Sequence, residues 1–173
     1  MSRLRVFNTT LFLLTVFLIQ ETIISRINFP INGFSLYIAT LMVVLSLEYR
    51  SGALVFGFIG GLVMDLSVGA DTPFGQWALV MTIMGYLFSI NKESIGDYTD
   101  SPLTLIGFIS IASAFSLLLF VVIGTLLGEE MGGVFRNISL IFANTIWTIL
   151  ITPIFIPVIM RVRKALLTGK EQV

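Results

Sequence analysis

Acidic side chains next to apolar stretches are the residues of this sequence most suited to chemistry. Glu21 follows an apolar run near the amino terminus, and Asp65 closes a glycine-rich run over residues 57–65. An ionisable group at membrane depth is costly, so each carboxylate needs a partner or a function. Together with Gln20, the two carboxylates predict a polar site that accepts a hydrogen bond or a cation. Solvation among lipid headgroups is the alternative, which we favour for Glu21.

Glycines at helical spacing precede Asp65. Gly57 and Gly61 form a G-x-x-x-G pair, which lets a second helix approach closely in lipid. We interpret this glycine-rich segment as a surface that docks a partner helix, with packing against another helix of the same chain as an equally open alternative. The predicted docking residues are Gly57, Gly60, Gly61, Asp65, Gly69 and Gly75.

Motifs for catalysis and metal binding are absent from the sequence. The chain has no cysteine and no histidine, which excludes a disulfide, a Cys/His zinc site, a thiol nucleophile and an imidazole base. Walker, H-E-x-x-H and G-x-S-x-G patterns are also missing. Glu129 and Glu130 are adjacent, but neighbouring side chains diverge on a helix, so we interpret them as a solvated loop. We expect no enzymatic activity, no cofactor and no metal.

The elements that carry these residues must be apolar helices. Of the 173 residues, 56% are hydrophobic and only 12% are charged, and the mean hydropathy is +0.99. A soluble domain is about one-quarter charged, so this composition predicts an all-α polytopic protein embedded in the lipid bilayer. The formal net charge is zero, which gives no electrostatic reason to expect a nucleic-acid partner.

Charged and turn-forming residues divide the chain into six apolar segments. A helix needs about 20 residues to cross the hydrocarbon layer, and several segments are somewhat shorter. Segment three has a re-entrant alternative, and segment one has a cleaved signal peptide as its alternative, although small cleavage-site residues are missing after it. The expected fold is one domain, 1–173, in a compact six-helix bundle with spans at about 6–25, 33–47, 52–66, 74–90, 103–127 and 138–160.

Helix punctuation supports these divisions. Thr72-Pro73 and Ser101-Pro102 each place a capping hydroxyl before a proline at the first helical position. Ser35 offers a similar start for the second span. Pro153 and Pro157 in the last span predict a bend, because each proline removes one backbone donor.

The distribution of basic residues predicts the orientation. With six spans and both termini in the cytoplasm, the cytoplasmic segments hold far more Lys and Arg than the outer ones, as the positive-inside rule expects. The outer residues would be Arg26 and Arg136. The cytoplasmic residues would be Arg3, Arg5, Arg50, Lys92, Arg161, Arg163, Lys164 and Lys170.

The segment from Gly57 to Tyr86 resembles the signature region of the rod shape-determining protein MreD family. That region reads roughly G-x-x-x-G-L-x-x-D, then a loop, then a helix that opens with P-x-G and reaches a G-Y pair. Residues 57–65, 73–75 and 85–86 carry these three patterns here. The resemblance covers residues 1–90 by motif and the rest by hydropathy.

Two further positions compare with the family's layout. Gln20 in the first span and Pro30 before the second fit it. Pro30 is followed by residues 31–33, Ile-Asn-Gly, where an acidic residue often stands in the family. This departure leaves a carboxylate role at the start of the second span without a residue to perform it.

The resemblance implies a non-enzymatic scaffold subunit of the bacterial cell-elongation complex, which directs peptidoglycan synthesis and rod shape from the inner membrane. Members bind MreC, a bitopic membrane protein, and are linked through it to MreB, RodA and the transpeptidase partner of RodA. Their fold is similar to that of the substrate-binding subunits of energy-coupling-factor transporters.

A transport subunit that binds a vitamin-like solute is therefore the alternative function. Those subunits carry an Ala-x-x-x-Ala motif in their first helix, whereas residues 6–25 of this chain contain no alanine. A transporter also brings several polar groups to a central site, and the apolar spans of this chain offer few.

Overall fold

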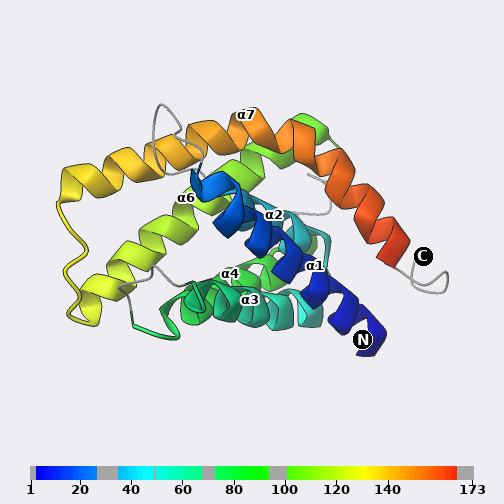
Figure 1. Ribbon diagram of the computed structural model, residues 1–173, viewed down its shortest axis with the longest axis horizontal. Helices are drawn as coiled ribbons and strands as arrows, with labels where there is room; N and C mark the ends of the chain where they lie inside the picture. The colour runs from blue at the N-terminus through cyan, green and yellow to red at the C-terminus, as the bar shows by residue number, and fades with distance from the viewer. Residues whose placement is uncertain (1–2, 27–34, 49, 68–72, 94–100, 167–173) are drawn as a thin grey trace.

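The structure is an all-helical bundle over the residues it describes (Figure 1). It is a computed structural model that describes residues 3–26, 35–48, 50–67, 73–93 and 101–166. Within these ranges lie six α-helices and one 3-10 helix, η1 (Ile24–Arg26). The α-helices are α1 (Arg3–Thr22), α2 (Leu36–Leu47), α3 (Arg50–Asp65), α4 (Gln76–Ile90), α6 (Pro102–Leu126) and α7 (Val134–Leu166).

Three of the helices are long and apolar enough to cross a membrane, namely α1, α6 and α7. The apolar helices α2 and α4 have 12 and 15 residues. At 1.5 Å per residue they reach about 18–22 Å, less than the ~30 Å hydrocarbon layer. Helix α3 is one uninterrupted helix of 16 residues. Length and composition therefore support a membrane protein, and the number of crossings stays a prediction.

Side-chain contacts show that successive helices run between the same two ends of the bundle. Arg5 at the start of α1 contacts Glu48 just after α2, whereas Gln20 near the end of α1 contacts the first residue of α2. Asp65 at the end of α3 contacts the start of α4. We call the two ends of the bundle the Arg5 end and the Trp77 end, because Arg5 lies at one and Trp77 at the other.

Helix α2 forms the centre of the bundle. Every residue from Leu36 to Ser46 is buried, which is typical of a helix that is apolar on all sides. Fully buried side chains of the neighbouring helices complete the core around it: Leu13 of α1, Phe56 of α3, Met81 of α4 and Ile109 of α6.

Three predicted helix starts have different outcomes. Pro102 is the first residue of α6, as predicted, although the Ser101 side chain makes no capping hydrogen bond. The prediction that Pro73 opens α4 is wrong, because the helix begins at Gln76 after a turn in which the Gln76 N–H donates to the Pro73 carbonyl. Thr72 lies outside the described residues. Ser35 caps α2 as predicted, since its hydroxyl accepts from the Ile38 N–H at 3.2 Å.

The last helix is longer than the predicted span 138–160. Helix α7 has 33 residues and contains Pro153 and Pro157. Figure 1 shows its orange-to-red part turning away from the line of its yellow part, in agreement with the predicted bend.

Candidate functional site

Helices α3 and α4 pack with their backbones almost in contact, and glycines make this possible. A Cβ atom at Gly57 would collide with the Met81 carbonyl oxygen, and one at Gly61 with the Trp77 carbonyl oxygen. From the other helix, a Cβ atom at Gly85 would collide with the Ala53 carbonyl oxygen. The hairpin thus depends on small residues on both helices, the pattern expected of close helix packing in lipid.

Asp65 closes this hairpin at the Trp77 end. Its Oδ1 accepts a hydrogen bond from the Trp77 N–H, and its Oδ2 accepts one from the Ala78 N–H, both at 3.0 Å. These are donors of the first turn of α4, which have no partner inside the helix. Gly75, the residue before α4, has φ +96°, a left-handed conformation that favours glycine, and it offers no side-chain cap. The carboxylate of α3 therefore caps α4.

These contacts bear on the two interpretations of the glycine pair. Gly57 and Gly61 are buried against α4, so the structure shows packing within the chain. Docking of a partner helix on this face would require α4 to leave it. Gly60 faces α2 instead, since a Cβ atom there would lie 2.6 Å from Leu41 Cδ1. Gly75 belongs to the turn before α4, and Gly69 lies outside the described residues.

Gln20 and Glu21 both lie at the Trp77 end, but their partners are on different elements. Gln20 Oε1 accepts from the Leu36 N–H at 2.9 Å and so caps α2. Glu21 is exposed and accepts from the Ser67 hydroxyl at 3.2 Å. Asp65 is engaged with α4 instead. Of the three residues of the predicted polar site, Gln20 and Asp65 thus cap helices, whereas Glu21 accepts from a side-chain hydroxyl.

Within the described part of the chain, two pockets at the Trp77 end share Trp77 as a lining residue. The smaller, about 230 Å³, is lined by polar residues and by aromatic and apolar neighbours; the polar ones include Gln20, Glu21, Ser35 and Ser67. The larger, about 420 Å³, lies between α4, α6 and the start of α7. Among the described residues, no group of three or more acidic side chains is placed to hold a metal ion.

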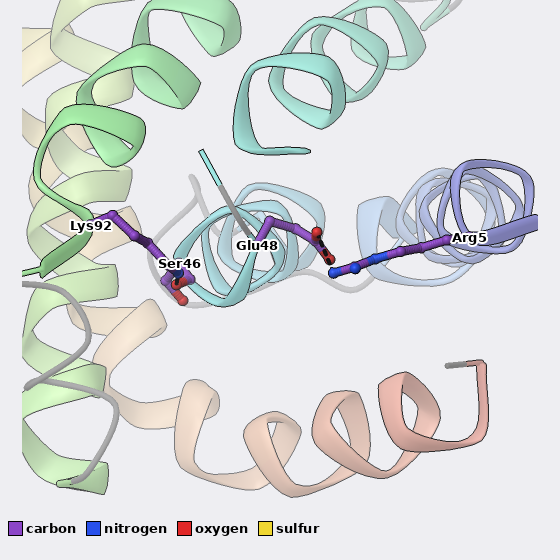
Figure 2. A network of polar contacts seen from close by, with 4 residues as sticks. All are labelled: Arg5, Ser46, Glu48 and Lys92. Carbon is purple, nitrogen blue, oxygen red and sulfur yellow. Dashed lines mark hydrogen bonds and ion pairs between the residues drawn. The ribbon is translucent and has the colours of Figure 1, made fainter. Parts of the chain in front are cut away.

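A second polar cluster lies at the Arg5 end (Figure 2). Arg5 Nη2 and Glu48 Oε2 form an ion pair at 2.6 Å, with side chains only 7% and 5% exposed. Lys92 Nζ, two residues beyond the end of α4, donates to the Ser46 carbonyl at 2.5 Å. An ammonium placed on the last carbonyls of α2 is favourable because those groups lack helical partners. Three helices are tied together at this end.

Sequence reasoning missed Tyr37 and the Arg5–Glu48 pair. The Tyr37 hydroxyl donates to the Gly60 carbonyl at 2.9 Å, and its ring meets that of Phe17 edge-on at 5.6 Å. A tyrosine inside an apolar run was a usable signal, because a buried phenol needs an acceptor. Glu48 and Arg5 are 43 residues apart, and spacing alone gives no reason to pair them.

Comparison with known proteins found no matching family model, no matching curated protein and no matching solved structure.

Proposed function

We propose that this chain is a non-enzymatic scaffold subunit of the bacterial cell-elongation complex, similar to MreD, in the inner membrane. One observation carries the proposal: the residues of the signature pattern act together in one structural unit. Helices α3 and α4 pack closely because of Gly57, Gly61 and Gly85, and Asp65 caps the start of α4. Such a unit offers a rigid surface for a partner, and the Asp65 carboxylate is already hydrogen-bonded to α4.

The outer face of this hairpin is the docking surface in our proposal. The side chains of Val55, Phe58, Leu79 and Tyr86 are all exposed there. Two of the four are large aromatic residues, which often dominate binding energy at interfaces. The proposed partner is the single membrane helix of an MreC-like bitopic protein, which links the chain to MreB, RodA and the transpeptidase partner of RodA. The glycines act indirectly, by holding the two halves of the face together.

The orientation in this proposal places the Arg5 end in the cytoplasm with both termini. Arg50 and Lys92 belong to the same end as Arg5, since Arg50 pairs with Glu93 and Lys92 contacts α2. Arg136 lies at the opposite end, next to Trp77 in the larger pocket. Basic residues thus gather at one end of the bundle, as the positive-inside rule requires of a cytoplasmic face.

Co-purification with the MreC-like protein tests the docking surface. We expect the double variant Phe58→Ala, Tyr86→Ala to lower the amount of partner retained by about tenfold or more, because each truncation removes an aromatic anchor. The matched control is Phe115→Ala, Leu118→Ala, which removes similar exposed side chains from α6. If the first variant retains the partner, or if both variants lose it equally, the outer face of the hairpin is not the docking surface.

A second candidate function is a solute-binding subunit of a vitamin-type transporter. The observation that favours it is the pocket of about 420 Å³, a size typical of small-ligand sites. A soluble molecule retained by the purified protein, together with uptake that is lost on deletion while cell shape stays normal, supports transport over scaffolding.

A further inference from the structure

The larger pocket at the Trp77 end has a lining divided into an apolar wall and a charged mouth. The rings of Trp77 and Phe120 stack with centroids 4.0 Å apart and form one side of the wall. Leu117, Val121 and Leu140 continue it along α6 and α7. Such a wall suits a hydrocarbon chain, because burying apolar surface away from water is favourable.

The mouth of the pocket holds two charges of opposite sign, Glu130 and Arg136. Within the part of the chain that the structure describes, the ion pairs join other residues, so neither charge is neutralised by the other. The Arg136 guanidinium lies against Gly132, which has φ +74°; a Cβ atom at Gly132 would collide with it. The loop thus keeps this cation near the pocket.

A buried acceptor stands beside the same pocket. Gln76 is 2% exposed, and its Nε2 donates to the Phe120 carbonyl at 2.8 Å. Its Oε1 is buried without a hydrogen-bond partner among the described residues. The Gln76 amide and the Met131 thioether meet at Gly124, and both Met131 and Phe120 line the pocket. An unsatisfied buried acceptor is costly, although Gln76 is not among the residues that line the pocket.

The position of the pocket selects a ligand that comes from the membrane. Helix α6 is long enough to span the bilayer, and the pocket lies where α6 ends and α7 begins. An α6 that spans the bilayer would therefore place the pocket at the depth of the lipid headgroups. An apolar wall below a mouth with one cation and one anion matches an amphiphile whose headgroup carries both charges. Charge-assisted hydrogen bonds make both contacts selective.

We propose that this pocket binds a phospholipid with a phosphate and a primary ammonium in its headgroup, the chemistry of phosphatidylethanolamine. The phosphate lies at Arg136, the ammonium at Glu130, and an acyl chain along the Trp77–Phe120 wall. This inference does not depend on the scaffold function, because it rests on the pocket and on the membrane-spanning length of α6.

Quenching of tryptophan fluorescence by brominated lipids tests the proposal, because Trp77 lines the pocket. The chain has two tryptophans, so Trp147→Phe leaves Trp77 as the only indole. The purified full-length protein in nonionic detergent is titrated with dibrominated phosphatidylethanolamine, dibrominated phosphatidylglycerol or dibrominated diacylglycerol. The control variant Trp77→Phe, which keeps Trp147, reports quenching by lipid elsewhere in the micelle.

We expect saturable quenching of Trp77 by phosphatidylethanolamine at a midpoint roughly tenfold lower than that of either other lipid. Arg136→Gln raises the midpoints of both phospholipids, whereas Glu130→Gln raises that of phosphatidylethanolamine alone. Both side chains are exposed, so neither change threatens the fold. Equal midpoints for the three lipids, indifference to both substitutions, or a retained soluble solute that blocks the quenching would overturn the assignment.

Discussion

One carboxylate, Asp65, has a structural partner that accounts for its position in an apolar chain. It joins the end of α3 to the first turn of α4 through two hydrogen bonds of 3.0 Å. An ionisable group at this depth is commonly interpreted as part of a functional site. Here both of its oxygens accept hydrogen bonds from backbone donors that would otherwise lack partners, so the side chain stabilises the hairpin as a helix cap.

Replacing Asp65 tests this capping role. We expect Asp65→Ala to lower the free energy of unfolding by about 1–2 kcal/mol, because the Trp77 and Ala78 N–H groups lose their acceptors. Asp65→Asn keeps one carbonyl acceptor and should retain part of that stability. Thermal denaturation of the detergent-purified protein measures both. If Asn is as harmful as Ala, the charge itself is required, and the capping account is wrong.

The two ion pairs at the Arg5 end differ mainly in burial, so they form a matched comparison. Glu48→Gln leaves the buried Arg5 guanidinium without its counter-charge, and we expect a loss of about 3 kcal/mol in the free energy of unfolding. Glu93→Gln removes the Arg50 pair, whose side chains are 64% and 93% exposed. Solvent screens that pair, so the melting temperature should stay almost unchanged. Equal shifts in the two variants would contradict the assigned burial.

At the scale of elements, the α3–α4 hairpin was partly readable from the sequence. The pattern of residues 57–65 correctly indicated close packing around Gly57 and Gly61. Spacing alone did not indicate that the second helix is α4, because internal and partner packing need the same small residues. The start of α4 was misplaced because a proline is a common first helical residue, whereas here the cap comes from Asp65, eleven residues before Gln76.

The six helical segments themselves were predictable, because charged and turn residues interrupt the apolar runs. The boundaries of α6 were predicted within one residue, whereas α7 extends beyond both predicted ends of its span. The contacts at the bundle ends were not predictable. Gln76 with Phe120, and Lys92 with Ser46, join residues more than 40 positions apart, and only the three-dimensional arrangement brings them together.

Adding a methyl group to the hairpin tests the close packing. We expect Gly57→Ala or Gly61→Ala to destabilise the protein by about 1–3 kcal/mol, because each Cβ would meet the α4 backbone and force the helices apart. Gly107→Ala in α6 is the matched control, since a Cβ there meets nothing within 4 Å. That control should be neutral or slightly stabilising. Hairpin variants as stable as the Gly107 variant would show that α3 and α4 are not in backbone contact.

At the scale of the whole molecule, the alternation of helix directions predicts the number of crossings. The chain has no cysteine, so single cysteines placed at exposed positions report sidedness through a membrane-impermeant maleimide. Ile23→Cys, Phe74→Cys and Gly133→Cys should react in intact cells. Ser51→Cys and Glu93→Cys should react only after permeabilisation. Two successive positions that react from the same side would show that the segment between them does not cross.

The measurement that tests the central claim most directly is the shape of cells depleted of this protein, recorded as the ratio of cell length to width. A scaffold of the elongation complex predicts that rods become spheres. The wild-type chain should restore the rods, whereas the chain carrying Phe58→Ala and Tyr86→Ala should not. Cells that remain rod-shaped after complete depletion would contradict the account.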